Sequence, residues 1–463
     1  MKALLLLLPL LAWAQTVKVR LNSSKLPIEI VSMSMEEYVT GVLGGEAGGI
    51  AEPEALKAFA VAARSYAMSN RGRHRKNGYD FCDTTHCQDL RLVSRSRRIE
   101  QAVEDTAAEL IWFRGEPAHA FYHRHCGGST EAVSAVWPAL RAEYLRARED
   151  NFCLTQGKAS WQTPITASDL AVSRRSATGR VREVRLDGRT TTFEQFQRWA
   201  GLSVRSARFE VVGGQGNFRL QGVGDGHGVG MCQTGAMVQA GQGRLYREIL
   251  AFYYPDTNTG VTAQGFSWSR MTSERIELWS VNQPERSLIV TAERGLREAE
   301  DRSRLPLAGR VKLRVFPTLA AYRHATGEPG WVVASTVNGW IRLQPVASLQ
   351  ARGVLEETLL HEMLHLLIAS QRLGPRIPLW FQEGIVLYLE QPHKPGGPDE
   401  LVEEHLRQPP DEAAMRRAYE HARRRVRSLV DRYGAGAVLS WIERGVPAEV
   451  TRSRFSQANS TSR

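Results

Sequence analysis

Two histidines four positions apart, His361 and His365, flank Glu362 in the run HEMLH. On an α-helix, residues at i and i+4 lie on one face, so both imidazoles can reach a single ion. The pattern is typical of zinc, and Glu362 beside the ligands is then placed to polarise a zinc-bound water. Two histidines leave zinc one protein ligand short of a typical catalytic site. Glu383, in the later run WFQEG, is the candidate for that third ligand.

The surrounding residues predict elements that can hold such a centre. Residues 353–373 are strongly apolar and predict the helix that carries HEMLH. Asn338-Gly339, just before it, lies between two apolar runs and predicts a β-hairpin. The outer strand of that hairpin can hold an extended peptide by strand addition. Tyr388 and Tyr419 are candidates for stabilising an oxyanion.

A second candidate for chemistry is Glu46, a lone carboxylate in the glycine-rich run GGEAGG. Ser34 and Glu37 form a capping-box pattern that starts a helix, and the glycines before Glu46 end it. A second, alanine-rich helix is expected over residues 53–70 and allows another backbone to approach closely. Glu46 is therefore expected just beyond a helix end. One glutamate can act as acid and then as base if burial raises its pKa.

Three separated motifs in the first half carry a family resemblance. The runs GGEAGGIAEPEALKAFAVAARSYA, FYHRHCGGST and GDGHGVGMCQTGAMVQAGQG resemble the SpoIID/LytB family of peptidoglycan lytic transglycosylases over about residues 25–260. The resemblance implies that Glu46 protonates the leaving glycosidic oxygen. Glu46 would then take the proton of the sugar's own hydroxyl, which gives an anhydro product.

The same resemblance implies glycan contacts. Arg64, Tyr66 and His227 are the candidates in the matching motifs. The alternative is that Tyr66 is a core residue, Arg64 belongs to a structural ion pair and His227 has a structural role. The chain departs from the family at Asp225, where an aromatic residue commonly precedes Gly-His-Gly.

The chain has five cysteines, all in its first half: Cys82, Cys87, Cys126, Cys153 and Cys232. An odd number outside the cytoplasm means that at least one is free, intermolecular or metal-bound. Some members of the family hold zinc through one histidine and two cysteines. His74, Cys82 and Cys87 occupy comparable positions and form a second candidate zinc site, with His86 as a competing ligand.

Disulfides are the rival interpretation of these cysteines. Cys82 and Cys87 can form a disulfide in an oxidising compartment. Cys126 and Cys153 bracket one segment and can also pair, whereas Cys232 has no obvious partner.

Residues of about 310–440 resemble the gluzincin metallopeptidases, whose third zinc ligand is a glutamate placed like Glu383. The resemblance implies a zinc-dependent peptidase with His361, His365 and Glu383 as ligands. The alternative is a buried helix whose histidines form internal hydrogen bonds.

Composition and the N-terminus indicate an exported globular protein. The 463 residues are 42% hydrophobic and 24% charged, an ordinary globular mixture. Lys2, the apolar run 3–12 and Ala12-Trp13-Ala14 are typical of a signal peptide. No later run is long and apolar enough to span a membrane. The net charge of +11 favours anionic wall polymers as partners, and nucleic acid is a poor partner for an exported chain.

Together these features predict an α+β chain: a SpoIID-like mixed α/β domain, then a zincin-like domain with a small sheet and an HExxH helix. The expected parts are a signal peptide (1–14), a transglycosylase domain (15–260), a linker and strand-rich connection (261–306), a metallopeptidase domain (307–455) and a polar tail (456–463). Residues 288–291 and 311–316 are expected as strands.

The predicted function is remodelling of peptidoglycan in the periplasm or outside the cell. The glycan strands and the peptides are the two expected substrates. The alternative is a non-catalytic amidase-enhancer or wall-binding module joined to a peptidase that acts on proteins.

Overall fold

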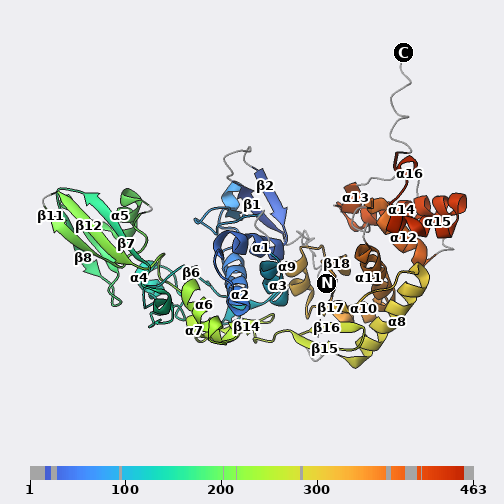
Figure 1. Ribbon diagram of the computed structural model, residues 1–463, viewed down its shortest axis with the longest axis horizontal. Coiled ribbons are helices and arrows are strands. Elements are labelled where there is room, and N and C mark those ends of the chain that lie inside the picture. The colour runs from blue at the N-terminus through green and yellow to red at the C-terminus, as the bar shows by residue number, and fades with distance from the viewer. Residues whose placement is uncertain are drawn as a thin grey trace, which may run out of the picture. The chain divides into compact units, whose positions relative to one another are not determined.

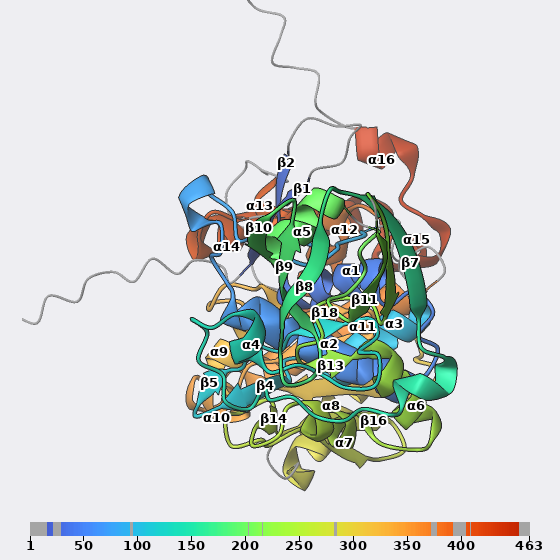
Figure 2. The ribbon, with the colours of Figure 1, turned by 90° about the vertical axis from the view of Figure 1, so that its left-hand side faces the viewer.

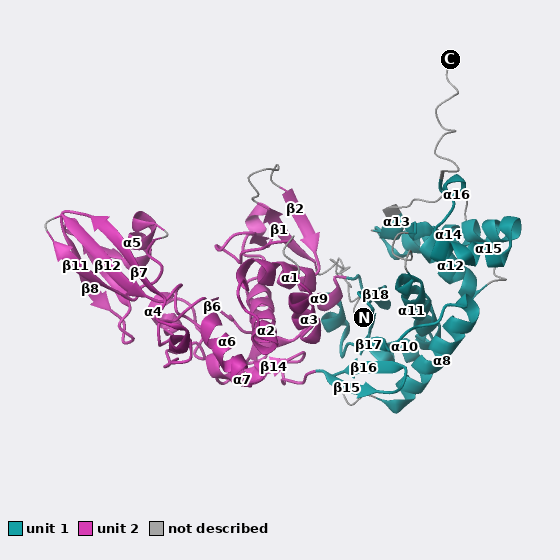
Figure 3. Ribbon diagram, in the orientation of Figure 1, with its two compact units in different colours: residues 1–12, 268–323, 328–463 teal, residues 13–267, 324–327 magenta. Residues whose placement is uncertain are grey.

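The computed structural model describes residues 16–21, 29–92, 96–201, 203–214, 216–281, 285–371, 377–391, 404–407 and 409–452. The predicted signal peptide and the polar tail 456–463 lie outside these residues. The chain forms two compact units, shown in Figure 3. We call residues 13–267 with 324–327 the N-terminal unit, and the rest the C-terminal unit. Helices and several small sheets in one chain confirm the prediction of a mixed α+β protein.

The N-terminal unit is built around α2 (Pro53–Ser69), which is buried along most of its length (Figure 1). The proline at its first turn suits a helix start, and its alanines allow close packing. The helices that pack against it are α1 (Met35–Glu46), α3 (Arg97–Asp105), α6 (Gln233–Gly241) and α7 (Tyr246–Tyr253). The predicted capping box of α1 is present, since Ser34 and Glu37 bond reciprocally.

Short strands surround these helices. One sheet has the order β2-β1-β3, a second has β14-β4-β5, and β6 pairs with β13 in parallel. The strands are β1 (Val17–Leu21), β2 (Glu29–Met33), β3 (Phe81–Cys82), β4 (Leu110–Phe113), β5 (Glu116–Pro117), β6 (Tyr122–His123), β13 (Met231–Cys232) and β14 (Asn258–Gly260). Short helical turns are η1 (Arg75–Asn77), α4 (Val133–Val136) and η2 (Cys153–Gln156). β14 pairs with β4, so the chain returns to the N-terminal sheet at the end of the expected transglycosylase domain.

Residues 160–223 lie between β6 and β13 in the sequence. We call them the insertion lobe. Their two antiparallel sheets have the orders β11-β12-β7 and β10-β9-β8, and they can be followed in Figure 2. The elements are β7 (Ser160–Thr166), β8 (Leu170–Arg175), β9 (Val181–Leu186), β10 (Arg189–Thr192), α5 (Phe193–Ala200), β11 (Phe209–Gly214) and β12 (Asn217–Val223). The lobe has a hydrophobic core of its own, with Trp161, Phe196 and Leu220 in it.

The C-terminal unit has a five-stranded sheet in the order β15-β16-β17-β19-β18. Its strands are β15 (Ser269–Thr272), β16 (Ile276–Ser280), β17 (Val311–Val315), β18 (Ala334–Val337) and β19 (Trp340–Leu343). The three inner strands are parallel, and the antiparallel β18 lies at one edge. β18 and β19 form the predicted hairpin around Asn338-Gly339.

Helices complete the second half of the chain: α8 (Arg286–Ser303), α9 (Leu319–Thr326), α10 (Val346–Ala351), α11 (Leu355–Ser370), α12 (Leu379–Glu390), α13 (Glu404–Arg407), α14 (Glu412–Tyr433), α15 (Ala435–Arg444) and α16 (Ala448–Arg452). Among the described residues, none of the helices is both long and apolar enough to cross a bilayer.

One expected strand is wrong. Residues 288–291 lie inside α8, because Leu288, Ala292 and Leu296 recur at helical spacing and are all buried against α11. The run LIVT has a high β-propensity, but burial of one helical face outweighs it.

Candidate functional site

Glu46 is the last residue of α1, one position earlier than expected. The loop that follows β3 comes against the end of this helix, where the Asp89 N–H donates to Glu46 Oε1 at 2.6 Å. Gly45 makes this approach possible, since a Cβ there would lie 2.1 Å from the Asp89 carbonyl oxygen. The glycine before the glutamate therefore serves close backbone contact.

Burial raises the pKa of Glu46 from 4.5 to about 7, although the Asp89 N–H and the Tyr122 hydroxyl oppose the shift by hydrogen bonding. The nearby charge of Asp89 adds to the increase. A carboxyl group with this pKa is protonated in a large fraction of molecules near neutral pH. It can therefore donate a proton and later accept one.

Glu46 opens into a cavity of about 840 Å³, within the range of ligand sites. Its lining comes from segments far apart in sequence: Gly45, Glu46, Tyr66, Asn70, Arg73, Thr85, His86, Cys87, Gln88, Asp89, Phe121, Tyr122, His123, Arg124, Trp137, Ala139, Leu140, Asp225, Gly226, His227 and Gln233. Of the expected glycan contacts, Tyr66 and His227 lie in this lining.

The polar atoms of Tyr66 and His227 form defined hydrogen bonds. The Tyr66 hydroxyl accepts from Arg73 Nη1 at 2.9 Å. His227 Nδ1 accepts from the Val229 N–H at 3.0 Å, so the proton of the neutral ring is on Nε2. Burial lowers the pKa of His227 to about 4, which keeps the ring neutral. The remaining ring N–H hydrogen-bonds the Tyr122 backbone, so His227 forms a fixed, neutral part of the cavity wall.

Arg64 is not in the cavity lining. Its guanidinium is buried and pairs with Glu36, with nitrogen–oxygen distances of 3.1 and 2.5 Å. It also donates to the Glu109 carbonyl. This placement corresponds to the ion-pair alternative for Arg64.

Sequence reasoning missed an aromatic wall of the cavity. The rings of Trp137 and His227 are 5.1 Å apart, and Phe121 is 4.6 Å from Trp137. Asp225, where the family commonly has an aromatic residue, instead forms an ion pair with Arg205. Phe121 lies in the quoted motif FYHRHCGGST, which was a signal for it, whereas no motif pointed to Trp137.

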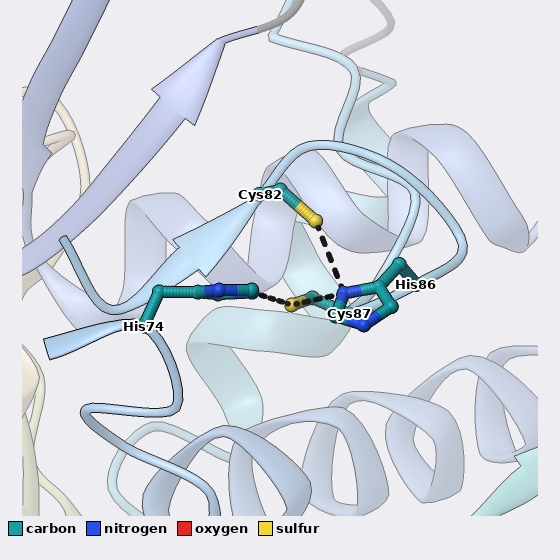
Figure 4. Close-up of side chains that lie close together, drawn as sticks. All are labelled: His74, Cys82, His86 and Cys87. Atoms are coloured by element: carbon teal, nitrogen blue, oxygen red, sulfur yellow. Dashed lines mark hydrogen bonds between the residues drawn. The ribbon is translucent and has the colours of Figure 1, made fainter. Parts of the chain in front are cut away.

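Four potential metal ligands converge next to this cavity: His74, Cys82, His86 and Cys87 (Figure 4). His74 Nε2 lies 3.2 Å from Cys87 Sγ, and His86 Nδ1 lies 3.6 Å from each sulfur. Tetrahedral zinc with bonds of about 2.0 to 2.3 Å separates its donor atoms by roughly 3.3 to 3.8 Å. The two cysteines are free thiols. The donor set therefore fits zinc, with His86 as a fourth ligand.

The C-terminal unit brings His361, His365 and Glu383 together. The two histidine Nε2 atoms are 3.1 Å apart, and His365 Nε2 lies 3.3 Å from Glu383 Oε2. His361 Nδ1 donates to Glu390 Oε1 at 2.9 Å, which leaves the Nε2 lone pair directed at the other two donors. A carboxylate behind a histidine is the usual second partner of a zinc ligand. No sequence motif pointed to Glu390.

The other predicted residues of this centre lie around it. Glu362 Oε2 accepts from the Thr336 hydroxyl at 2.6 Å, and Thr336 belongs to the edge strand β18. The hydroxyl of Tyr419 hydrogen-bonds Glu383, whereas Tyr388 packs against the hydrophobic core. The site thus combines three potential metal ligands that face one another, the adjacent carboxylate of Glu362 and the edge strand β18.

The first half of the chain is similar to known proteins. Residues 25–113 match the family described as SpoIID, Stage II sporulation protein. An uncharacterized protein of Brachyspira hyodysenteriae is 30% identical over 249 residues, covering 49% of this chain and 67% of that protein.

Two characterised relatives come from Bacillus subtilis. Stage II sporulation protein D is 26% identical over 259 residues, covering 49% of this chain and 75% of the relative. The amidase enhancer is 26% identical over 284 residues, covering 47% of this chain and 39% of the relative.

Proposed function

Because the chain carries a SpoIID-family domain in its N-terminal half, we propose that it is an exported cell-envelope enzyme that cleaves peptidoglycan glycan strands by lytic transglycosylation. The observation that carries this proposal is Glu46, whose burial raises its pKa to about 7 at the wall of a large cavity. The basic net charge of +11 suits a polyanionic wall.

The residues around Glu46 support a two-step proton transfer. Protonated Glu46 would donate to the glycosidic oxygen as the bond to the sugar breaks. Its carboxylate would then take the proton of the sugar's hydroxyl as that oxygen closes the anhydro ring. The N–H of Asp89 and the Tyr122 hydroxyl stabilise the ionised form between these steps. The aromatic wall, which includes the neutral ring of His227, would orient the sugar.

Zinc held by His74, Cys82, His86 and Cys87 would act as a structural crosslink. It would join the loop that follows β3 to the chain near η1. His86 and Cys87 line the cavity, and Asp89 follows them closely. The ion would therefore fix the backbone that bonds Glu46.

The test is digestion of purified peptidoglycan by the full-length chain, followed by mass analysis of the soluble products. We expect anhydromuramyl ends from the parent protein and from Glu100→Gln, which changes an exposed glutamate of α3, but not from Glu46→Gln. If the parent releases no anhydro-sugar but accelerates an added amidase, the wall-binding alternative is correct. The name of the amidase-enhancer relative makes this the appropriate comparison.

A second candidate function belongs to the C-terminal unit: zinc-dependent hydrolysis of peptides. His361, His365 and Glu383 would hold the ion, which supplies Lewis-acid activation when bound. Glu362 would take a proton from the attacking water. The exposed edge of β18, next to Glu362 through Thr336, would hold the peptide by strand addition.

This second function is tested with wall stem peptides and with a denatured protein as separate substrates. Glu362→Gln should retain the metal but lose hydrolysis. Glu357→Gln, an exposed glutamate on the same helix, is the matched control and should keep both. Equal hydrolysis by Glu362→Gln and the parent would exclude this centre as the source of peptidase activity.

A further inference from the structure

Three cysteines and one aspartate converge in the interior of the N-terminal unit, apart from the sites above. Cys126 follows β6, Cys232 ends β13, and Asp150 and Cys153 lie at the start of η2. Their sulfur and carboxylate donor atoms all lie within 4.8 Å of one another. All four side chains have no exposed surface.

The spacing of these donors is that of ligands around one ion. Cys126 Sγ lies 3.3 Å from Cys153 Sγ and 3.3 Å from Asp150 Oδ2. These distances match the edge of a zinc tetrahedron, about 3.3 to 3.8 Å when the bonds are 2.0 to 2.3 Å. None of the three sulfurs is bonded to another. The cluster therefore has the ligand types and the dimensions of a buried zinc site.

Two backbone N–H groups point at the sulfur of Cys232. Two N–H groups, those of Cys126 and Gly235, donate to its sulfur at 3.3 and 3.4 Å. Cys232 is also the N-cap of α6, where the helix dipole favours negative charge. Gly235 is required for this packing, since a Cβ there would lie 2.1 Å from the Tyr253 hydroxyl. The chain is thus arranged around a sulfur that accepts hydrogen bonds.

Asp150 supplies the observation that points to a cation. The Tyr253 hydroxyl donates to its Oδ2 at 2.9 Å, but its buried Oδ1 has no hydrogen-bond partner among the described residues. A buried carboxylate oxygen without a partner is costly. A disulfide between Cys126 and Cys153 would consume two sulfurs and leave both this oxygen and Cys232 unexplained. A metal ion uses all four groups.

Positive charge lies next to the cluster. The buried Arg180 donates through Nη2 to the Cys126 carbonyl at 2.6 Å, and it interacts electrostatically with Cys126 and Cys232. Three thiolates, one carboxylate and Zn²⁺ would carry a net negative charge, which this guanidinium would partly offset.

We propose that Cys126, Asp150, Cys153 and Cys232 bind a structural zinc ion. The ion ties β6, β13 and η2 together beneath the cavity, because His123 of β6 and Gln233, which follows Cys232, both line it. This site is independent of the proposed catalytic functions.

The experiment uses the full-length chain with Cys82→Ser and Cys87→Ser, so that thiolate ligands remain only in this cluster. Its folding is checked against the parent by circular dichroism. After replacement of zinc by cobalt, we expect thiolate-to-metal charge-transfer absorption that corresponds to one cobalt ion per chain; cobalt held by His361, His365 and Glu383 has no thiolate ligand and does not contribute to this band. Asp150→Asn in this background should weaken cobalt binding by tenfold or more, because it removes an anionic ligand.

A second measurement uses the unmodified chain and does not depend on any variant folding. Native protein is alkylated before and after chelation, and the modified cysteines are then mapped. The proposal predicts that Cys126, Cys153 and Cys232 are protected before chelation and react after it. A Cys126–Cys153 disulfide in the map, or folded Cys82→Ser, Cys87→Ser protein without thiolate-to-cobalt absorption, would overturn it.

Discussion

Replacing Glu46 with glutamine should stabilise the protein at alkaline pH while abolishing glycan cleavage. Burial raises the pKa of this carboxyl from 4.5 to about 7, so the folded state binds its proton more tightly than the unfolded state. The contribution of Glu46 to stability is therefore fully present below pH 4.5 and is lost as the pH rises towards 7. At about 1.4 kcal/mol per pKa unit, the loss reaches about 3 kcal/mol.

Glutamine has the shape of the protonated carboxyl and does not ionise. We expect Glu46→Gln and the parent to unfold with nearly equal free energies at pH 4. At pH 8 the variant should be the more stable by about 3 kcal/mol, while its release of anhydro products falls by 10²-fold or more. The assay is urea unfolding of the full-length chain at both pH values, monitored by tryptophan fluorescence.

The control is Glu100→Gln, which removes an exposed carboxylate and should leave the difference between the two pH values unchanged. If Glu46→Gln and the parent differ by the same amount at pH 4 and pH 8, the folded pKa is not raised. The assignment of Glu46 as a protonated acid would then lose its physical basis.

Three further predictions concern the pH dependence of glycan cleavage, the zinc ligands of the C-terminal unit and the packing of α12. The rate of glycan cleavage by the parent should fall as the pH rises above about 7, because the Glu46 carboxyl loses the proton it must donate; a pH–rate profile that is flat from 6 to 9 would contradict this. His365→Ala should lower the zinc content of the full-length chain by one equivalent relative to the parent in metal analysis, since two protein ligands hold zinc poorly, and an unchanged zinc content would refute the three-ligand site. Gly384→Ala should destabilise the C-terminal unit by about 1–3 kcal/mol in thermal unfolding, because its Cβ would lie 2.3 Å from the Ala422 carbonyl oxygen; unchanged stability would contradict that packing.

Local features of this chain were predictable because neighbouring residues determine them. The capping box of α1 and the Asn338-Gly339 hairpin depend on residues a few positions apart, and both are present. The two histidines of HEMLH face each other because one helix carries both. The exception is α8, where the prediction followed the β-branched run LIVT, although the buried residues recur at helical spacing.

The features that the sequence did not reveal depend on contacts between residues that are far apart in the chain. Asp89 reaches Glu46 only after the chain has folded back on α1, and Glu390 reaches His361 from the far end of α12. The sequence suggests only Cys153 as a partner for Cys126, whereas Cys232, more than a hundred positions away, lies next to Cys126 in the folded chain. Periodicity reports which residues are buried together, but not which distant side chains meet.

The burial of α2 has a consequence for how the chain acquires its structure. The helices that cover α2 come from both ends of the N-terminal unit, since α6 and α7 begin only at Gln233 and Tyr246. Until those residues have been synthesised, an alanine-rich apolar helix has no cover on that side. Contacts of such sequence separation form slowly, and partly folded chains with exposed apolar surface aggregate. The N-terminal unit should therefore aggregate readily when the chain is truncated before α6.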